Sequence, residues 1–139
     1  LRLSGSFKIT NEMGRISFED IHILIADNEK GVTDLLSELL GEFGCSVTVV
    51  SNLETALSEL ARCKPSIIIS DRLLPGFDAL YGQVRSDQNL SHVPFILLTA
   101  DELFEEALSD TFFDVWLKPF DVEELIVKFR GLLQRVKLA

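Results

Sequence analysis

The chain has 139 residues, of which 47% are hydrophobic and 25% are charged, and its formal net charge at pH 7 is -9. This length and composition are typical of one globular domain, which excludes a two-domain enzyme and a disordered chain. The excess of acidic side chains disfavours direct binding to nucleic acid or to anionic membrane surfaces. Apolar runs stay below the ~18 residues of a membrane span, and the first residues lack the layout of a signal peptide, so we expect a cytoplasmic protein.

The first 20 residues are polar, contain glycine and show no clear period. We therefore expect an N-terminal tail or linker over residues 1–20 and one domain over residues 21–139, and we leave open a short strand at residues 15–18. The two cysteines, Cys45 and Cys63, form no CxxC pattern, which favours two small buried apolar side chains over a metal site.

Five short apolar runs alternate with stretches of helical period from residue 21 onward. The runs are mostly β-branched or large and do not alternate with polar residues, which is typical of parallel strands covered on both faces. They predict strands at residues 21–26, 47–50, 67–69, 95–98 and 115–117. Parallel strands joined by helical crossovers give an α/β fold with a three-layer sandwich.

Two of the helices between these strands have a clear apolar stripe. Residues 32–43 form the first stripe, which ends near Gly44, a natural left-handed cap. Residues 53–61 form the second, and Ser51 with Glu54 has the spacing of a capping box at its start.

The remaining helices differ in the strength of their signals. The last one begins at an Asp121 cap and runs to about residue 136. A helix at residues 79–86 has weak support because Gly82 lies in its middle. A short amphipathic helix is expected at residues 103–108.

Polar side chains follow the predicted strands at the carboxyl ends, which in such sheets form one rim where ligands bind. Asp27 follows the first strand, Asp71 the third, Thr99 the fourth and Lys118 the fifth. A single polar residue at a strand end is usually a cap or turn former. Acidic loops, a hydroxyl and a lysine on one rim are together what a Mg²⁺-assisted phosphoryl site needs.

Four segments on this rim resemble the signature blocks of one known family. They are ILIADNE at residues 23–29, IISDRLLPGFD at 68–78, ILLTA at 96–100 and WLKPF at 116–120. In this order they are similar to the response-regulator receiver domain of two-component signalling, over residues 21 to about 137. The resemblance implies a flavodoxin-like, doubly wound (βα)5 fold with a five-stranded parallel sheet of strand order 2-1-3-4-5.

The resemblance also implies a role for each residue of the rim. Asp71 would be the phosphoacceptor, taking a phosphoryl group from a phosphohistidine of a sensor histidine kinase or a phosphotransfer protein. Thr99 would then hydrogen-bond the phosphoryl group, and Lys118 would pair with one of its oxygens. The Lys118–Pro119 peptide bond is typically cis in the family. The implied cofactor is Mg²⁺, held by Asp27, Asn28, Asp71 and the backbone carbonyl of Leu73.

This chain departs from the family pattern at three points. Asn28 stands where the family usually has a second acid, and Glu29 is the nearest replacement for the missing charge. Val115 replaces the usual aromatic residue three positions before the lysine, and Trp116 faces the other side of the strand because side chains alternate. The spans from Asp71 to Thr99 and from Thr99 to the lysine are also somewhat short.

Three functions follow from these patterns. The first is a phosphorylatable receiver that is not itself an enzyme and that switches its interaction with an unidentified output protein or domain. The second is a degenerate receiver that serves as a phosphorylation-independent interaction module. The third, a small enzyme or flavin carrier, is disfavoured because the loop after the first strand is acidic where anionic cofactors need positive charge.

Residues 101–114 carry six acidic side chains and neither Lys nor Arg. This segment is either a solvated acidic face or a surface that selects a basic output partner.

Overall fold

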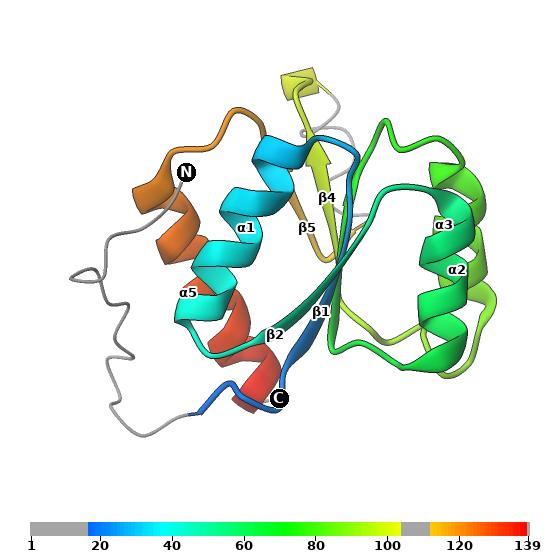
Figure 1. The fold of residues 1–139 in the computed structure, drawn as a ribbon, viewed down its shortest axis with the longest axis horizontal. Helices are drawn as coiled ribbons and strands as arrows, with labels where there is room; N and C mark the ends of the chain where they lie inside the picture. Colours follow the sequence, from blue (N-terminus) through cyan, green and yellow to red (C-terminus); the bar gives the residue numbers. More distant parts are fainter. Residues whose placement is uncertain (1–16, 104–111, 139) are drawn as a thin grey trace.

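The computed structural model describes residues 17–103 and 112–138. Along the described residues the β-strands alternate with α-helices up to β4, and β5 and α5 complete the order (Figure 1). They are β1 His22–Ala26, α1 Lys30–Glu42, β2 Ser46–Val50, α2 Leu53–Arg62, β3 Ile67–Asp71, α3 Phe77–Ser86, β4 Phe95–Thr99, β5 Asp114–Leu117 and α5 Val122–Leu138.

The five strands form one parallel sheet in the order β2-β1-β3-β4-β5, as predicted. The register aligns their carboxyl ends. Ala26 at the end of β1 pairs with Val50 of β2 and with Ser70 of β3, and Thr99 at the end of β4 pairs with Leu117 of β5. The residues that follow these positions therefore gather along one edge of the sheet.

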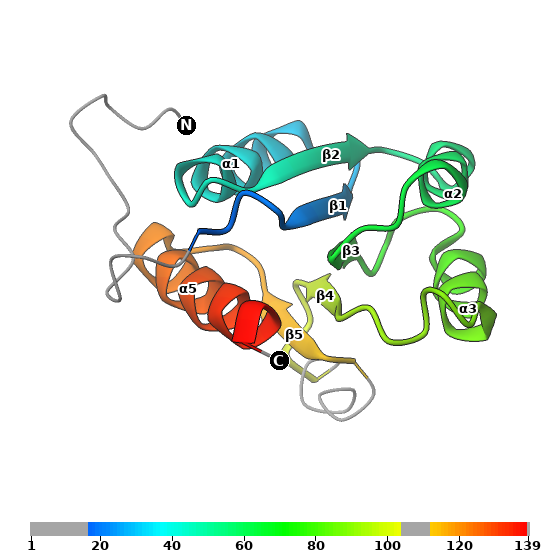
Figure 2. The same ribbon diagram turned by 90° about the horizontal axis from the view of Figure 1, so that it is seen from below.

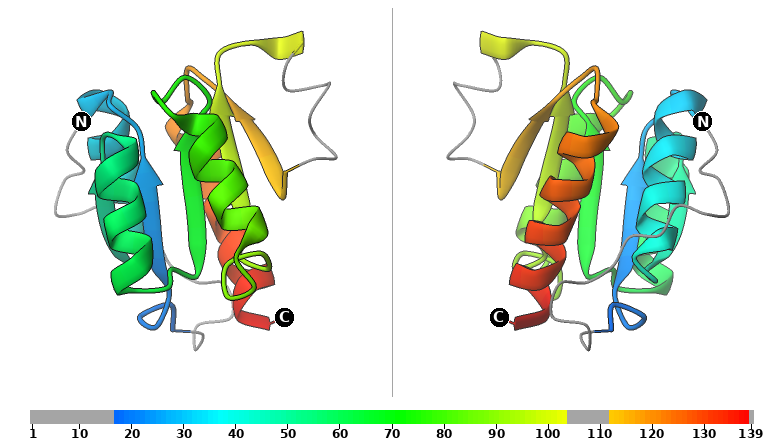
Figure 3. Two further views of the ribbon diagram at one scale, coloured as in Figure 1. Left: turned by 90° about the vertical axis from the view of Figure 1, so that its right-hand side faces the viewer. Right: turned by 90° about the vertical axis from the view of Figure 1, so that its left-hand side faces the viewer.

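Helices cover both faces of the sheet, with α1 and α5 on one side and α2 and α3 on the other (Figures 2 and 3). Alternating strand side chains supply the two cores because successive residues point to opposite faces. Ile23 and Ile25 of β1 lie in the core with the α1 and α5 side chains, whereas Leu24 lies in the core with those of α2 and α3. Parallel strands buried on both faces explain the continuous apolar runs in the sequence.

Part of the segment that we assigned to the tail packs against the domain. Phe18 is only 3% exposed, and its ring lies edge-on to Phe43, which in turn lies edge-on to Phe129 of α5. Asp20 accepts a hydrogen bond from Lys137 near the end of α5, at 2.6 Å. Residues 17 and 18 are not in a strand; the rest of the strand left open at residues 15–18 lies outside the described residues.

The capping residues of the helices agree with the prediction except at the start of α2. The cap of α2 is Asn52, whose side chain accepts a hydrogen bond from the Thr55 backbone N–H at 2.9 Å; the capping box expected from Ser51 is wrong. Asp121 caps α5 as predicted, accepting from the Glu123 backbone N–H at 2.8 Å. Gly44 adopts the expected positive φ after α1.

The helices expected at residues 79–86 and 103–108 have different outcomes. α3 forms, and it begins two residues before the predicted start. Most of the helix predicted at residues 103–108 lies outside the described residues, as does most of the acidic segment from 101 to 114.

The two cysteines differ in exposure. Cys45 is buried in the core, and this burial, with a smaller contribution from Asp20, raises the pKa of its thiol to about 12. Cys63 is exposed at the end of α2, so the prediction that both thiols are buried is wrong for Cys63.

Candidate functional site

Two neighbouring strands bring two buried carboxylates to the rim. Asp27 follows β1 and is 1% exposed, and Asp71 ends β3 and is 6% exposed. Glu29, from the loop after β1, completes the group. One carboxylate oxygen from each of the three residues lies within 4.8 Å of the others. Oxygen ligands at this separation fit a hard divalent cation.

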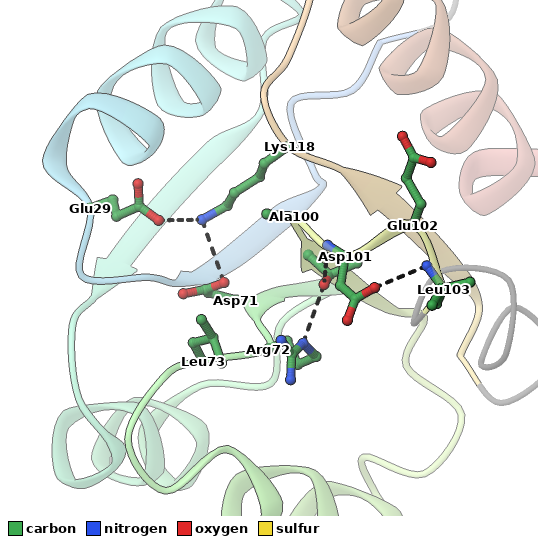
Figure 4. A pocket seen from close by; sticks show the side chains of 10 residues that line it. Glu29, Asp71, Arg72, Leu73, Ala100, Asp101, Glu102, Leu103 and Lys118 are labelled. Carbon is green, nitrogen blue, oxygen red and sulfur yellow. Dashed lines mark hydrogen bonds and ion pairs between the residues drawn. The ribbon is translucent and has the colours of Figure 1, made fainter.

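Lys118 holds this acidic group together. Its Nζ lies 2.9 Å from Asp27 Oδ2, 2.7 Å from Glu29 Oε1 and 3.4 Å from Asp71 Oδ1 (Figure 4 shows the contacts with Glu29 and Asp71). The Lys118–Pro119 peptide bond is cis, as the resemblance implied. The lysine therefore reaches across the sheet from the end of β5 to the ends of β1 and β3.

Burial and charge act in opposite directions on these groups. Burial raises the pKa of Asp71, aided by the nearby negative charge of Asp27 and opposed by Lys118. Burial alone would lower the pKa of Lys118, but hydrogen bonds to Glu29 and Asp27 outweigh it, so the pKa of Lys118 is raised. The lysine stays charged, and one ammonium group faces three carboxylates. The surplus of negative charge favours a bound cation.

Thr99 ends β4, the strand next to the one that ends at Asp71, and is 1% exposed. Its hydroxyl oxygen accepts a hydrogen bond from Arg72 Nε at 3.2 Å and another from the Asp101 backbone N–H at 3.1 Å (Figure 4). The sequence reasoning gave Arg72 no role. Because β3 and β4 are adjacent, the residue after Asp71 comes next to the end of β4, but a strand order alone does not say which side chains bond.

A pocket of about 520 Å³ opens over these residues. Asp71, Thr99 and Lys118 line it together with Arg72 and Glu29. Figure 4 shows Lys118 and Arg72 on different sides of Asp71. The pocket thus presents several carboxylates, a hydroxyl and two cationic groups to one space.

The structure places only some of the predicted metal ligands in the acidic group. Asp27 and Asp71 lie in the acidic group, whereas Asn28 is exposed and is not a member of the group found among the described residues. Glu29 is a member. Leu73 is 68% exposed, and its backbone N–H donates a hydrogen bond to Asp71, which places its backbone at the site.

In β5, the strand before Lys118, successive side chains point to opposite faces of the sheet, as predicted. Val115 lies in the core beside α2 and α3, where the family usually has an aromatic residue. Trp116 lies in the opposite core, 1% exposed, with its ring edge-on to Phe129 and its Nε1 donating to Asp114 at 2.8 Å.

A model of the response regulator receiver domain matches residues 23–130 of this chain. Among curated proteins, a probable transcriptional regulatory protein of Mycobacterium tuberculosis, TcrX, is 28% identical over 129 residues. The match covers 88% of this chain and 54% of TcrX. The chain therefore spans about half the length of this relative.

Solved structures give the same result. A putative response regulator from Chloroflexus aurantiacus is 28% identical, with a TM-score of 0.72 over 83% of this chain and 98% of that one. The receiver domain of a sensor histidine kinase from Pseudomonas aeruginosa is 26% identical, with a TM-score of 0.71 over 86% and 98% of the two chains. That domain was solved with a magnesium ion coordinated in its active site cleft.

Within the described ranges, no helix has both the length and the apolar character needed to cross a membrane. The sheet order, the cluster of acids with a lysine at the carboxyl edge and the match over residues 23–130 agree with one another. The chain belongs to the response regulator receiver domain family of two-component systems.

Proposed function

We propose that this receiver domain accepts a phosphoryl group on Asp71 from the phosphohistidine of a sensor histidine kinase or a phosphotransfer protein. The observation that carries the proposal is the position of the Asp71 carboxylate. It lies at the carboxyl edge of the sheet, on the wall of a pocket, beside a second carboxylate and within 3.4 Å of the Lys118 ammonium group.

The proposed reaction transfers phosphorus from nitrogen to oxygen. An Asp71 carboxylate oxygen attacks the phosphorus atom of a phosphohistidine whose other ring nitrogen is protonated. The P–N bond breaks with its electron pair going to nitrogen, and the donor leaves as neutral imidazole. The product is an acyl phosphate on Asp71. Lys118 pairs with a phosphoryl oxygen and Thr99 donates a hydrogen bond to another, so both stabilise charge that moves into the pocket.

The residues at the site fit the divalent cation that such a transfer uses. Asp27, Glu29 and Asp71 offer oxygens in one cluster, and the carbonyl of Leu73 and the side chain of Asn28 are the further ligands that we propose. When bound, Mg²⁺ neutralises the negative charge that gathers between the carboxylates and the incoming phosphoryl group.

The proposed role is that of a switch and not of an enzyme that turns over a metabolite. Phosphorylation adds a doubly charged group beside Thr99 and Lys118, which changes the contacts of two strand ends. We propose that this change alters binding to an output protein or domain in the cytoplasm, without direct contact of this domain with nucleic acid or membrane. The acidic composition and the family support this proposal.

Intact-mass spectrometry tests the proposal. The protein is incubated with phosphoramidate and Mg²⁺, and we expect one phosphoryl adduct on the wild type. Asp71→Asn should lose the adduct, and so should wild type in excess chelator, because the transfer needs both the nucleophile and the cation. Asp34→Asn, which changes an exposed acid of α1, is the matched control and should keep the adduct.

An adduct that survives in Asp71→Asn would contradict the assignment. No adduct on any variant, in protein that is folded and supplied with Mg²⁺, would favour the degenerate receiver that signals without phosphorylation.

A further inference from the structure

Arg72 occupies a fixed place beside the phosphoacceptor. It directly follows Asp71, and its backbone N–H donates to the Leu98 carbonyl at 2.8 Å, which completes the last β3–β4 pair, Asp71 with Leu98. From there its side chain lines the pocket, with Nε 3.2 Å from the Thr99 hydroxyl oxygen (Figure 4). Arg72 therefore connects the residue after the nucleophile to the hydroxyl at the neighbouring strand end.

The hydrogen bonds to Thr99 limit what its hydroxyl can do. A hydroxyl group has one proton to donate and two lone pairs that accept. In this chain Arg72 Nε–H and the Asp101 backbone N–H donate to the Thr99 oxygen, so both lone pairs are used. The hydroxyl proton remains, and it is available to an acceptor in the pocket. A phosphoryl oxygen on Asp71 would be such an acceptor.

We infer that Arg72 is a positioning residue that fixes the Thr99 hydroxyl as a hydrogen-bond donor to the phosphoryl group, an inference that rests on the proposed phosphorylation of Asp71. A donor that is oriented before the reaction needs no reorganisation when charge develops on the phosphoryl oxygens. The positive guanidinium group also polarises the hydroxyl, which strengthens it as a donor.

Two substitutions separate the hydrogen bond from the charge. Arg72→Gln places an amide nitrogen the same number of bonds from the backbone as Arg Nε, so it keeps a donor and loses the charge. Arg72→Lys keeps the charge and has a methylene group at that position. If Arg72 acts through Thr99, the glutamine variant keeps more of the function than the lysine variant.

The experiment measures the rate of phosphorylation by phosphoramidate in saturating Mg²⁺. We expect Arg72→Lys to be about tenfold slower than wild type, as the loss of one hydrogen bond from a charged donor predicts, and Arg72→Gln to stay within about threefold. In a Thr99→Val background the difference between the two variants should disappear, because the group that Arg72 positions is gone.

Two controls make the comparison specific. Arg62→Met removes a cation from the exposed end of α2 and should leave the rate unchanged. Thermal unfolding of each variant checks the fold, because a purely structural role would lower the melting temperature of both Arg72 variants and would not depend on Thr99.

The opposite ranking, with lysine faster than glutamine, would overturn the inference, and so would a lysine–glutamine difference that persists in Thr99→Val. The opposite ranking would mean that Arg72 acts by its charge on the phosphoryl group, whereas a persisting difference would mean that it acts independently of Thr99. Equal rates for all variants would also overturn it while leaving the proposed function intact. Absence of any adduct on wild type would instead overturn the proposed function, and this inference with it.

Discussion

At the scale of single residues, the site carries more negative than positive charge. Asp27, Glu29 and Asp71 face one ammonium group, that of Lys118. Asp27 and Asp71 are buried and repel one another, and a bound cation would offset the surplus of negative charge. The raised pKa of Asp71 is the consequence of this burial and repulsion.

The exposed Asn28 gives a direct test of how charge sets cation affinity. We expect Asn28→Asp to bind Mg²⁺ more tightly than wild type, by about tenfold, because the variant adds one full charge beside the acidic group. Isothermal titration calorimetry at constant ionic strength measures the two affinities. Asn52→Asp, at the α2 cap, adds the same charge elsewhere and serves as the control. Equal affinities for Asn28→Asp and wild type would show that position 28 lies outside the reach of the ion.

Most of the site follows from the sequence because strand ends are easy to locate. Apolar runs predicted where β1, β3, β4 and β5 end, and the parallel arrangement then placed Asp27, Asp71, Thr99 and Lys118 on one rim. The contact of Arg72 with Thr99 was not predictable in this way. It depends on the rotamer of a long side chain and on the β3–β4 register. The same holds for Glu29, which the sequence offered only as the nearest replacement for the missing charge and which lies in the acidic group.

At the scale of elements, α3 depends on the turn that precedes it. Gly76 caps the helix with a φ of 84°, and a Cβ atom at this position would lie 2.8 Å from Leu53 Cδ2 and 3.0 Å from Leu53 Cβ. This turn carries the chain from Asp71 to α3. Gly82, in contrast, lies on the exposed side of α3, where an added Cβ atom would have no neighbour within 4 Å among the described residues.

These two glycines predict opposite effects of the same substitution. Gly76→Ala should lower the free energy of unfolding by at least ~1–2 kcal/mol, because the left-handed conformation and the contact with Leu53 both oppose a side chain. Gly82→Ala should raise it by about 0.5–1 kcal/mol, since alanine is the better helix former. Urea denaturation of the two variants measures both values. A destabilised Gly82→Ala or an unchanged Gly76→Ala would contradict this description of α3.

Element boundaries were less predictable than element types. The sequence pattern placed the five strands within one or two residues of their observed ends. It chose Ser51 for the start of α2, but Asn52 makes the cap, because either side chain can accept the hydrogen bond and only the backbone conformation decides. For α3 the cost of Gly82 suggested a marginal helix, yet Leu80 and Val84 are buried against the sheet and hold it in place.

At the scale of the whole molecule, the packed unit includes more of the chain than its pattern indicated. Phe18 extends the row of aromatic rings through Phe43 to Phe129, and Trp116 continues it to β5. This row runs beneath α1 and α5. A single buried aromatic residue in an irregular segment gives no periodic signal, which is why the sequence did not place Phe18 in the core.

Removal of the Phe18 ring should therefore destabilise the domain. We expect Phe18→Ala to lower the free energy of unfolding by about 3 kcal/mol, the usual cost of deleting a buried phenyl group. Val127→Ala, at a side chain that is 66% exposed on α5, is the control and should change it by less than about 0.5 kcal/mol. Equal, small effects of the two substitutions in chemical denaturation would show that Phe18 does not belong to the core.

Borohydride reduction locates the phosphoryl group on the chain and so tests whether Asp71 is the phosphoacceptor. The protein is phosphorylated with acetyl phosphate and Mg²⁺ and then treated with borohydride, which reduces an aspartyl phosphate to homoserine. Peptide mapping by tandem mass spectrometry then finds the changed residue. We expect homoserine at position 71 only. A reduced product at Asp27 or Glu29, with Asp71 unmodified, would contradict it.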